Sequence, residues 1–312
     1  MDLPSPSSAT LNPLLLATIA GSVLTVAWLT RRSPRQRHAR GRWLALTAGA
    51  LLLAVAWVSP VATVSEHYLL SAHLLQITLV MGFAPPLLLL AMPMHPRVHV
   101  NAKIAAVLRA CVHPLPAVIA VNAAFFLWHL AGPYDAATGD WTLYAAEQIT
   151  LFVVSIVFWW PIVAPLSPPV RSMTPLSKLG YILLATIPQT FGGLLVALAH
   201  HPLYTTYVSA PRLFGFSVMT DQQLAGACIA LVSKISLLAA FFVIFMRALQ
   251  SSGAEGDEGG GGGGGRGPDR GAPRPIPSGT PEWLRKLESG QTVPEPVPAR
   301  ATVPAASGSR RG

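Results

Sequence analysis

Seven apolar runs, each close to the length of a membrane-spanning helix, dominate the sequence up to residue 250. They cover residues 11–30, 43–64, 69–92, 115–132, 146–165, 179–199 and 223–247. Because a helix rises about 1.5 Å per residue, about 20 apolar residues are needed to cross a hydrocarbon core of about 30 Å. The pattern therefore predicts an all-α integral membrane protein: a bundle of seven transmembrane helices over residues 11–249, preceded by a short outer leader at 1–10.

The basic residues between the runs predict how the chain is oriented. Six Arg residues lie in RRSPRQRHARGR after the first run, and five more Lys and Arg residues follow the third and fifth runs, whereas the four opposite segments hold only Arg212. By the positive-inside rule the N-terminus is outside and the C-terminus is cytoplasmic. The first run precedes its Arg residues, so it is expected to be a retained span and not a cleaved signal peptide.

Composition agrees with a membrane protein and argues against a nucleic-acid partner and against disulfide or CxxC chemistry. Hydrophobic residues make up 52% of the chain and charged residues 11%, far below the charged fraction of about 25% in soluble domains. Topology accounts for the net charge of +9, so no nucleic-acid partner is expected. Cys111 and Cys228 are predicted on opposite sides of the membrane, which argues against a disulfide, and the chain has no CxxC motif.

The C-terminal part of the chain has a different composition. After Arg247 it is rich in Gly and Pro, and such a segment cannot bury enough apolar area to offset its ordering entropy. We therefore expect residues 250–312 to form a disordered cytoplasmic tail, in which only TPEWLRKLESG carries helix signals, with Thr280 as its cap. The GGGGGGG run lacks the strand, Lys and Ser/Thr of a phosphate-binding loop.

Polar and aromatic residues gather at the predicted outer ends of the spans. They are His73 and Gln76 in the third span, Trp128 and His129 at the end of the fourth with Tyr134 and Asp135 just after it, Tyr144, Glu147 and Gln148 at the start of the fifth, and His201, Asp221 and Gln222 between the sixth and seventh. Singly, each has an ordinary explanation, such as an interfacial aromatic, a solvated His or a helix N-cap for Asp221. Together they indicate a functional site, because polar groups below the interface are costly unless paired.

The histidines in this set suggest a metal site, since imidazole suits copper, zinc and iron. His73, His129 and either His200 or His201 belong to three spans that meet the outer side, so they could converge at one mouth of the bundle. Glu147 or Asp135 could orient a ring N–H, and Met219 could add a soft ligand for Cu(I). No HxxxH or MxxM motif accompanies them.

Two adjacent prolines, Pro85 and Pro86, interrupt the third span. Each removes a backbone donor, so the pair predicts a kink or an unwound turn about two turns before the helix ends. In a membrane the freed carbonyl groups must be satisfied by neighbouring helices. The two prolines are therefore expected to face protein and not lipid.

Six stretches carry a family likeness. They are SP at 59–60, SAHLLQ…APPLLLLAMP at 71–93, WHLAGPYDAA at 128–137, AAEQITLF…FWWPIVAPLS ending at 167, HPLYTTY at 201–207 and DQQLAG at 221–226. In this order they resemble the CtaG-like family of polytopic cytochrome c oxidase assembly factors, first associated with caa-type oxidases. The likeness covers residues 59–249, close to two-thirds of the chain.

The resemblance implies a non-enzymatic, multi-pass protein of the bacterial plasma membrane. It implies a role in assembling a haem-copper oxidase, at the step that supplies copper, with oxidase subunits and a copper chaperone as partners. Residue by residue, it places His73 on the first His of the family's third helix, Glu147 on its carboxylate position, and Asp221 and Gln222 on its DQ pair. His129, Tyr134 and Asp135 fall on its WH…YD motif.

The chain departs from the family at three histidine positions, and it has Ala131 where members have a proline after WHL. Members commonly read HMxQHML in the third helix and HxLEH at the start of the fifth, whereas this sequence has Ile77, Tyr144 and Gln148 at three of those His positions. Either the site is reduced or different, or the function is structural: a metal-free scaffold that binds oxidase subunits. The sequence leaves both interpretations open.

A retinal protein is an alternative from another class, because Lys234 lies inside the last span. A protonated Schiff base in lipid needs a counter-ion, and the third span, 69–92, contains no carboxylate. Lys234 is instead expected to pair with a polar group or to snorkel along its helix. An enzyme is not indicated, since no nucleophile has a base in range.

Overall fold

The computed structural model describes residues 3–32, 39–93, 101–163 and 173–257, and in these ranges the chain is helical with no strand. The helices are α1 (Pro13–Arg31), α2 (Ala39–Trp57), α3 (Pro60–His67), α4 (Leu70–Thr78), η1 (Leu79–Phe83), α5 (Ala84–Ala91), α6 (Ala102–Cys111), α7 (Pro114–Trp128), α8 (Ala131–Gly139), α9 (Trp141–Val163), α10 (Pro175–Leu198), α11 (Thr205–Val208), α12 (Val218–Ala227), η2 (Cys228–Val232) and α13 (Lys234–Asp257). The segments η1 and η2 are π-helical turns. The expectation of an all-α fold is confirmed for the described residues.

Five continuous helical stretches are long and apolar enough to cross a membrane. They are α1, Leu70–Ala91, α9, α10 and Val218–Gln250. Two bent pairs raise the number to as many as seven if each pair is one span: Arg40–Trp57 with Pro60–His67, bent by 43°, and Ala102–Cys111 with Pro114–Trp128, bent by 65°. The described chain therefore has five to seven candidate spans.

The breaks fall where the sequence analysis assumed uninterrupted helices. Run 43–64 is split because Ser59 caps a new helix: its side chain accepts a hydrogen bond from Val61 N, and Pro60 occupies the first turn. Run 115–132 ends at Trp128, with His129 as C-cap, and α8 begins at Ala131. Local capping chemistry, which hydrophobicity does not report, sets both boundaries.

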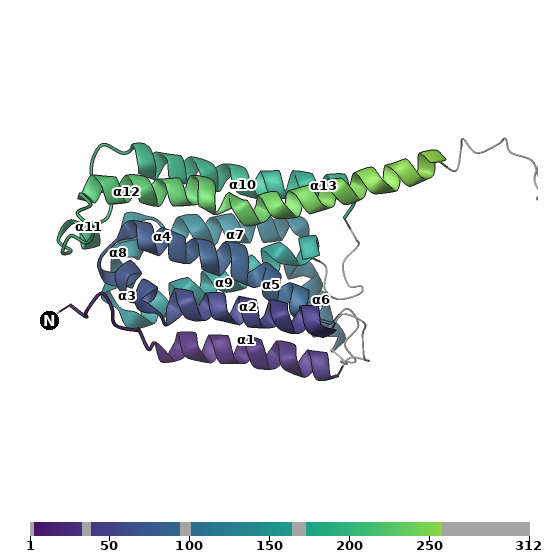
Figure 1. Ribbon diagram of the computed structural model, residues 1–312, viewed down its shortest axis with the longest axis horizontal. Helices are drawn as coiled ribbons and strands as arrows, with labels where there is room; N and C mark the ends of the chain where they lie inside the picture. Colours follow the sequence, from purple (N-terminus) through teal and green to yellow (C-terminus); the bar gives the residue numbers. More distant parts are fainter. Residues whose placement is uncertain (1–2, 33–38, 94–100, 164–172, 258–312) are drawn as a thin grey trace, which may run out of the picture. The chain divides into compact units, whose positions relative to one another are not determined.

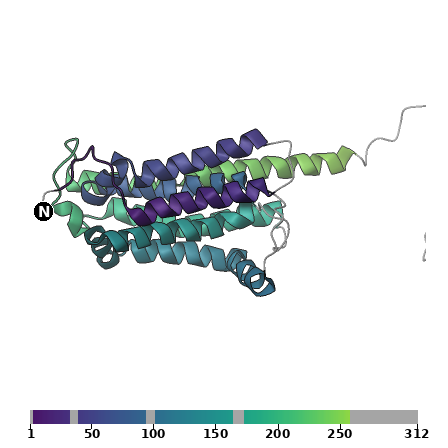
Figure 2. The same cartoon turned by 90° about the horizontal axis from the view of Figure 1, so that it is seen from below.

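The long helices lie side by side, with α10 and α13 along one side and α1 along the other (Figure 1). The short helices α3, α8 and α11 gather at one end, which we call the cap end. At the other end α6 is turned away from the axis of α7 (Figure 2). We call this the basic end, because α1 finishes there with Arg31 and α10 starts there, carrying Lys178.

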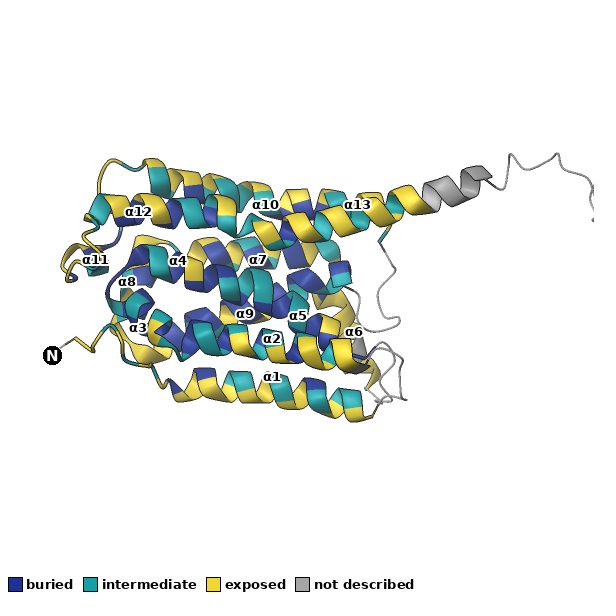
Figure 3. Cartoon of the chain, in the orientation of Figure 1, coloured by how far each residue is buried: buried dark blue, intermediate teal, exposed yellow. Residues whose placement is uncertain are grey.

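Buried residues form three apolar clusters that hold these helices together. One joins α1, α2, α5 and α9, a second joins α5, α7, α9, α10 and α13, and the third joins α4, α7, α8, α11 and α12 near the cap end. The inner helices are the most buried, whereas α1, α10 and α13 expose most of their apolar residues (Figure 3). Apolar faces left open in this way suit contact with lipid.

The structure accommodates the two prolines with a π-helical turn. Pro85 and Pro86 occupy the first turn of α5, directly after η1. The carbonyl of Met81 would pair with residue 85 in an α-helix or residue 86 in a π-helix, and neither proline has an N–H. The indole Nε1 of Trp159 on α9 donates to this carbonyl instead, at 3.0 Å. A neighbouring helix thus satisfies the freed group, as expected, and Leu70–Ala91 stays helical throughout without an unwound turn.

Replacing Trp159 by phenylalanine is expected to lower the stability of the detergent-solubilised protein by about 1–3 kcal/mol. The change removes the donor and leaves the partly buried Met81 carbonyl without its hydrogen bond. The measurement is the thermal unfolding midpoint. Trp160→Phe is the matched control, because Trp160 packs against the same apolar cluster and no hydrogen bond of its indole is described. Equal shifts of the midpoint for the two substitutions would show that the hydrogen bond from Trp159 to Met81 does not stabilise the protein.

Helices α10 and α12 approach each other at two glycines. A Cβ atom on Gly226 would lie 2.5 Å from Gly193 O and 2.5 Å from Ala197 N, and one on Gly193 would lie 2.8 Å from Gly226 O. These obstacles are backbone atoms, so they cannot rotate away. Small residues that allow such close backbone approach are typical of packed transmembrane helices.

The predicted tail lies almost entirely outside the described residues. Helix α13 continues past the expected boundary at 249 and ends at Asp257. Residues 258–312, with the glycine run and TPEWLRKLESG, are not described, and the same holds for most of the basic loop after α1. Cys111 and Cys228 are both free thiols, in agreement with the absence of a disulfide between them.

Candidate functional site

Three helices bring His73, His129 and Glu147 together, and we call these residues the His–Glu cluster. His73 lies on α4, Glu147 on α9, and His129 directly follows α7. The Nε2 atom of His73 is 3.3 Å from Oε1 of Glu147, and both side chains have no exposed surface. The ring centroids of His73 and His129 are 6.1 Å apart. The sequence analysis named all three residues as site candidates.

Most polar atoms of this cluster have no hydrogen-bond partner. Both ring nitrogens of His73, Nε2 of His129 and both carboxylate oxygens of Glu147 are buried and unpaired in the described part of the protein. The 3.3 Å contact is an ion-pair distance, but its orientation does not satisfy hydrogen-bond geometry. Buried polar groups are nearly always paired in proteins, and unpaired ones are costly. Such a cluster within a membrane bundle is a functional-site hypothesis by default.

The position of His129 fixes which of its nitrogens is available. Its Nδ1 lies 2.7 Å from the carbonyl oxygen of Phe125, and its ring stacks on the Phe125 ring at 4.2 Å. A carbonyl oxygen only accepts, so Nδ1 carries the proton and Nε2 keeps a free lone pair. A hydrogen bond of this kind is how proteins orient a histidine that ligates a metal.

Tyrosines from α8 and α11 close one side of the cluster. The ring of Tyr134 lies 4.9 Å from that of His73, and its hydroxyl is 2.7 Å from the hydroxyl of Tyr207. The Tyr207 hydroxyl in turn donates to the carbonyl of Ser65 on α3. Burial raises the pKa of Tyr134 and Tyr207 well above the ordinary value, and raises the pKa of Tyr204 to about 12. These hydroxyls therefore remain protonated donors at neutral pH.

A satisfied hydrogen-bond network borders the cluster on the α2 side. Gln76 Oε1 accepts from the Tyr144 hydroxyl at 2.9 Å and from Ser65 Oγ at 3.0 Å, and Gln76 Nε2 donates to Ala56 O. Gln148 accepts from the indole of Trp57 at 2.9 Å. Two of the positions at which family members carry histidine are thus held in polar contacts that join α2, α3, α4 and α9.

Ile77, at the third such position, has a different environment. Its side chain is buried in the apolar cluster near the cap end, together with Leu74, Phe125 and Ile229. An imidazole there would be surrounded by hydrocarbon. At the three positions where family members carry histidine, this chain therefore has two members of the hydrogen-bond network and one apolar core residue. Both ring nitrogens of His73 and Nε2 of His129 have no hydrogen-bond partner in the described part of the chain.

Asp221 and Gln222 act as connections between elements. Asp221 accepts hydrogen bonds from the backbone N–H groups of Leu70 and Ser71, at 2.8 and 3.0 Å. It thereby caps α4, whose own N-cap residue, Leu69, has no side-chain hydrogen bond. The simpler interpretation, in which Asp221 caps its own helix, is wrong: Ser217 caps α12. Gln222 holds the preceding loop through Leu203 N and His201 O.

Asp135 plays the same part for α11. Its carboxylate accepts from the backbone N–H and hydroxyl groups of Thr205 and Thr206, which lie in the first turn of that helix. Carboxylates are favourable at helix N-termini because they pair with free N–H groups. The acidic residues of the WH…YD and DQ motifs thus position the wall of the cluster and do not enter it.

The remaining candidates lie outside the cluster. His201 has an exposed side chain, Met219 is half-buried, and Trp128 packs at the edge of the apolar cluster near the cap end. Among the described residues, no group of three or more His, Cys, Asp or Glu side chains is placed to hold a metal ion. The donor types of the His–Glu cluster suit copper, but they do not converge into a three-ligand site.

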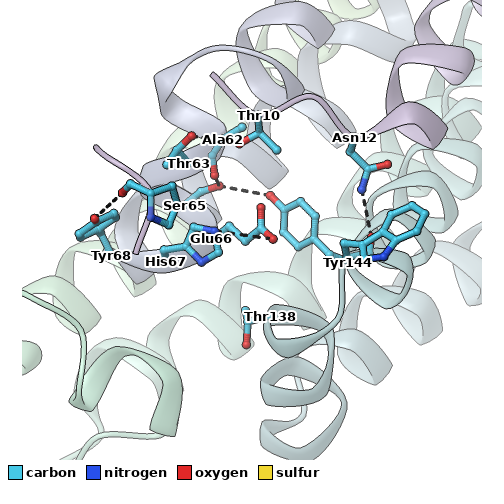
Figure 4. Close-up of polar contacts among 12 residues, drawn as sticks. Thr10, Asn12, Ala62, Thr63, Ser65, Glu66, His67, Tyr68, Thr138 and Tyr144 are labelled. Atoms are coloured by element: carbon cyan, nitrogen blue, oxygen red, sulfur yellow. Dashed lines mark hydrogen bonds and ion pairs between the residues drawn. The ribbon is translucent and has the colours of Figure 1, made fainter. Parts of the chain in front are cut away.

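Glu66 is a fourth member of this region that the sequence analysis did not include in the site. It is buried on α3, and its Oε1 atom lies 3.9 Å from Nε2 of His67 (Figure 4). The charges of His73 and Glu147 act on its carboxyl group. Its position at the end of the second apolar run was a signal, since a carboxylate there requires a partner. Only the fold shows that His73 on α4 and Glu147 on α9 are the charged groups that act on it.

The N-terminal leader covers α3 and so closes this end of the site. The Tyr68 hydroxyl donates to Pro4 O at 2.6 Å, Thr63 Oγ1 donates to Ser8 O at 2.7 Å, and Asn12 Nδ2 donates to Trp141 O at 3.0 Å. Figure 4 shows Thr10 beside Thr63, and Asn12 at the start of α9. Leader, α3 and α9 thus form one hydrogen-bonded surface over the cluster.

Lys234, the residue behind the retinal alternative, also lies apart from the cluster. It is half-buried at the start of α13, and its Nζ has no hydrogen-bond partner within the ranges described. Of the two alternatives expected for Lys234, pairing with a polar group finds no partner in these ranges, and snorkelling along the helix stays a prediction. No carboxylate lies within ion-pair distance of it in the same ranges, since the recorded ion pairs involve only His67 and His73.

These features define a polytopic helical membrane protein with a buried polar site at one end of the bundle. The family model of the cytochrome c oxidase caa3 assembly factor, Caa3_CtaG, matches residues 23–251. The chain belongs to this family, and the resemblance found in the sequence is confirmed. Family members are assembly factors and not a class of catalytic enzymes. Comparison with curated proteins and with solved structures gave no match.

Proposed function

We propose that this chain crosses the bacterial plasma membrane seven times, with the cap end outside and the C-terminus in the cytoplasm. The support is the distribution of charge over the bundle. Among the described residues, Arg31, Arg40, Lys178 and Arg247 belong to helix segments at the basic end, whereas Arg212 lies between the cap-end elements α11 and α12. The positive-inside rule puts the basic end in the cytoplasm.

On this basis the chain assists copper incorporation into a caa3-type cytochrome c oxidase at the outer face of the membrane. The single observation that carries the proposal is the set of unpaired, buried imidazole and carboxylate atoms in the His–Glu cluster. Copper would be cargo, received from a chaperone and passed to an oxidase subunit. His129 offers Nε2, and Glu147 orients His73 and balances charge.

Copper retention by the purified protein tests this proposal. Protein loaded with Cu(I) and then desalted is expected to keep close to one equivalent of copper. Glu147→Gln keeps the shape of the side chain but removes the charge beside His73, and is expected to weaken copper binding by about 10–100-fold. His201→Ala is the control, because that side chain is exposed, and should bind as wild type. Loss of copper from the wild-type protein during desalting would refute the proposal.

A metal-free scaffold is the second candidate, and a specific observation favours it. Tyr144 and Gln148, at family histidine positions, are engaged in the network around Gln76, and no three-donor group is present among the described residues. In that case the cap end would bind an oxidase subunit without ligating copper. Deleting the gene and adding copper to the medium separates the two: restored oxidase activity supports delivery, and no restoration supports scaffolding.

A further inference from the structure

A groove of about 430 Å³ lies toward the basic end of the bundle, whereas the His–Glu cluster lies toward the cap end. Its walls come from η1, α5, α9 and α13, and they include Pro86 and Leu90 on α5, Trp159 and Ile162 on α9, and Ala240 and Ile244 on α13. The lining is apolar except for Ser236 and Arg247. Leu90 and Val243 on its rim are exposed, so the groove opens on the lipid-facing side of the bundle.

The length of the groove matches one leaflet of a bilayer. Along α13 it extends from Ile235 to Arg247, which at about 1.5 Å per residue is about 18 Å. Half of a hydrocarbon core of about 30 Å is about 15 Å. A groove that begins near the middle of the membrane therefore ends at the level of the lipid headgroups, and Arg247 stands at that end.

Two cations meet at the headgroup end. The Nζ atom of Lys178 donates to the carbonyl oxygen of Ile162, a lining residue, at 3.0 Å. Lys178 and Arg247 are close enough to repel each other. No carboxylate forms an ion pair with either residue in the described part of the chain. An ammonium has three donors, and Ile162 uses one, so an anion at this point would both relieve the repulsion and fill free donors.

We propose that this groove binds an anionic phospholipid, with one acyl chain along α13 and the phosphate between Lys178 and Arg247. The apolar walls fit the chain, the groove length fits a leaflet, and the two cations fit the headgroup. Basic pockets between transmembrane helices at the cytoplasmic side are known to hold anionic lipid headgroups. The bound lipid would join α13 to α5 and α9 at the end where α13 leaves the bundle.

Native mass spectrometry of the full-length protein tests the proposal. Protein taken from phosphatidylglycerol vesicles is expected to retain one lipid molecule, with a preference of about 30-fold over phosphatidylcholine, the factor that two basic residues contribute near an anionic headgroup. The K178Q/R247Q variant is expected to lose this preference. Ala240→Leu, which fills the groove without changing charge, is expected to lower retention of both lipids.

The controls separate a built site from general attraction to basic residues. Arg31→Gln with Arg40→Gln removes two exposed cations from the same end of the bundle, on α1 and α2, and should leave the preference unchanged. An equal loss in this control, or equal retention of both lipids by the wild-type protein, would overturn the proposal. So would a lipid-free dimer, since a second copy would then occupy the groove.

Discussion

Replacing both His73 and His129 by leucine is expected to remove most of the caa3-type oxidase activity of cells that depend on this protein. Leucine is similar in volume to histidine, so packing around Tyr134 and Phe125 is largely kept, while both imidazoles of the His–Glu cluster are lost. The change also removes the imidazole that lies 3.3 Å from the buried Glu147 carboxylate and the Nδ1 donor of His129, so part of the stability is expected to be lost. The measurement is oxidation of reduced cytochrome c by membranes, normalised to the amount of variant protein in them.

The matched control is His201→Leu, which changes an exposed imidazole at the same end of the bundle and should leave activity unchanged. If the leucine double variant fails to accumulate, glutamine at both positions keeps polar side chains there and allows the same comparison. Wild-type oxidase activity in a double variant that accumulates normally would exclude the cluster from the function of this protein.

Gly226→Ala is expected to destabilise the protein by about 3 kcal/mol or more, at the upper end of the range for overpacked cores. The new Cβ would meet backbone atoms of α10 at 2.5 Å, so α10 and α12 would have to separate. Because Asp221 on α12 caps α4, the shift would also disturb the helix that carries His73. The measurement is the thermal midpoint of the detergent-solubilised protein.

Gly180→Ala provides the contrast for this prediction. Gly180 lies on the same helix as Gly193, and a Cβ atom there would meet nothing within 4 Å. Alanine has a higher helix propensity than glycine, by up to about 1 kcal/mol, so this variant should be as stable as wild type or slightly more stable. A Gly226→Ala protein with an unchanged midpoint would refute the close approach of α10 and α12.

Hydrophobic periodicity predicted the positions of the helices well and their interruptions less well. Runs of about 20 apolar residues identify spans because bilayer thickness sets that length. The 43° and 65° bends depend on the Ser59 cap of α3 and on Pro114 in the first turn of α7, which act within one turn and barely change average hydrophobicity. The double proline was correctly expected to need a partner, but only packing identified that partner as Trp159.

The location of the site was predicted from the sequence. Which of its residues form the His–Glu cluster, and which hold neighbouring elements in place, was not. Polar residues at one end of several spans indicated a shared location, and His73, His129 and Glu147 do meet there. Asp135, Asp221 and Gln222 looked equally suited to a ligand from their types alone. In the structure they cap or hold neighbouring elements. That role depends on which donor groups of other elements the fold places within hydrogen-bond distance of their side chains.

The sequence by itself determined that this is a helical membrane protein, which end of each span is polar, and the assembly-factor family to which it belongs. These are properties of composition, periodicity and local order along the chain. Only the tertiary structure decided which polar groups are paired: Gln76, Tyr144 and Gln148 satisfy one another, whereas the His–Glu cluster remains unsatisfied. The physical reason is that a hydrogen bond needs two atoms about 3 Å apart, and residues on different helices reach that distance only through packing.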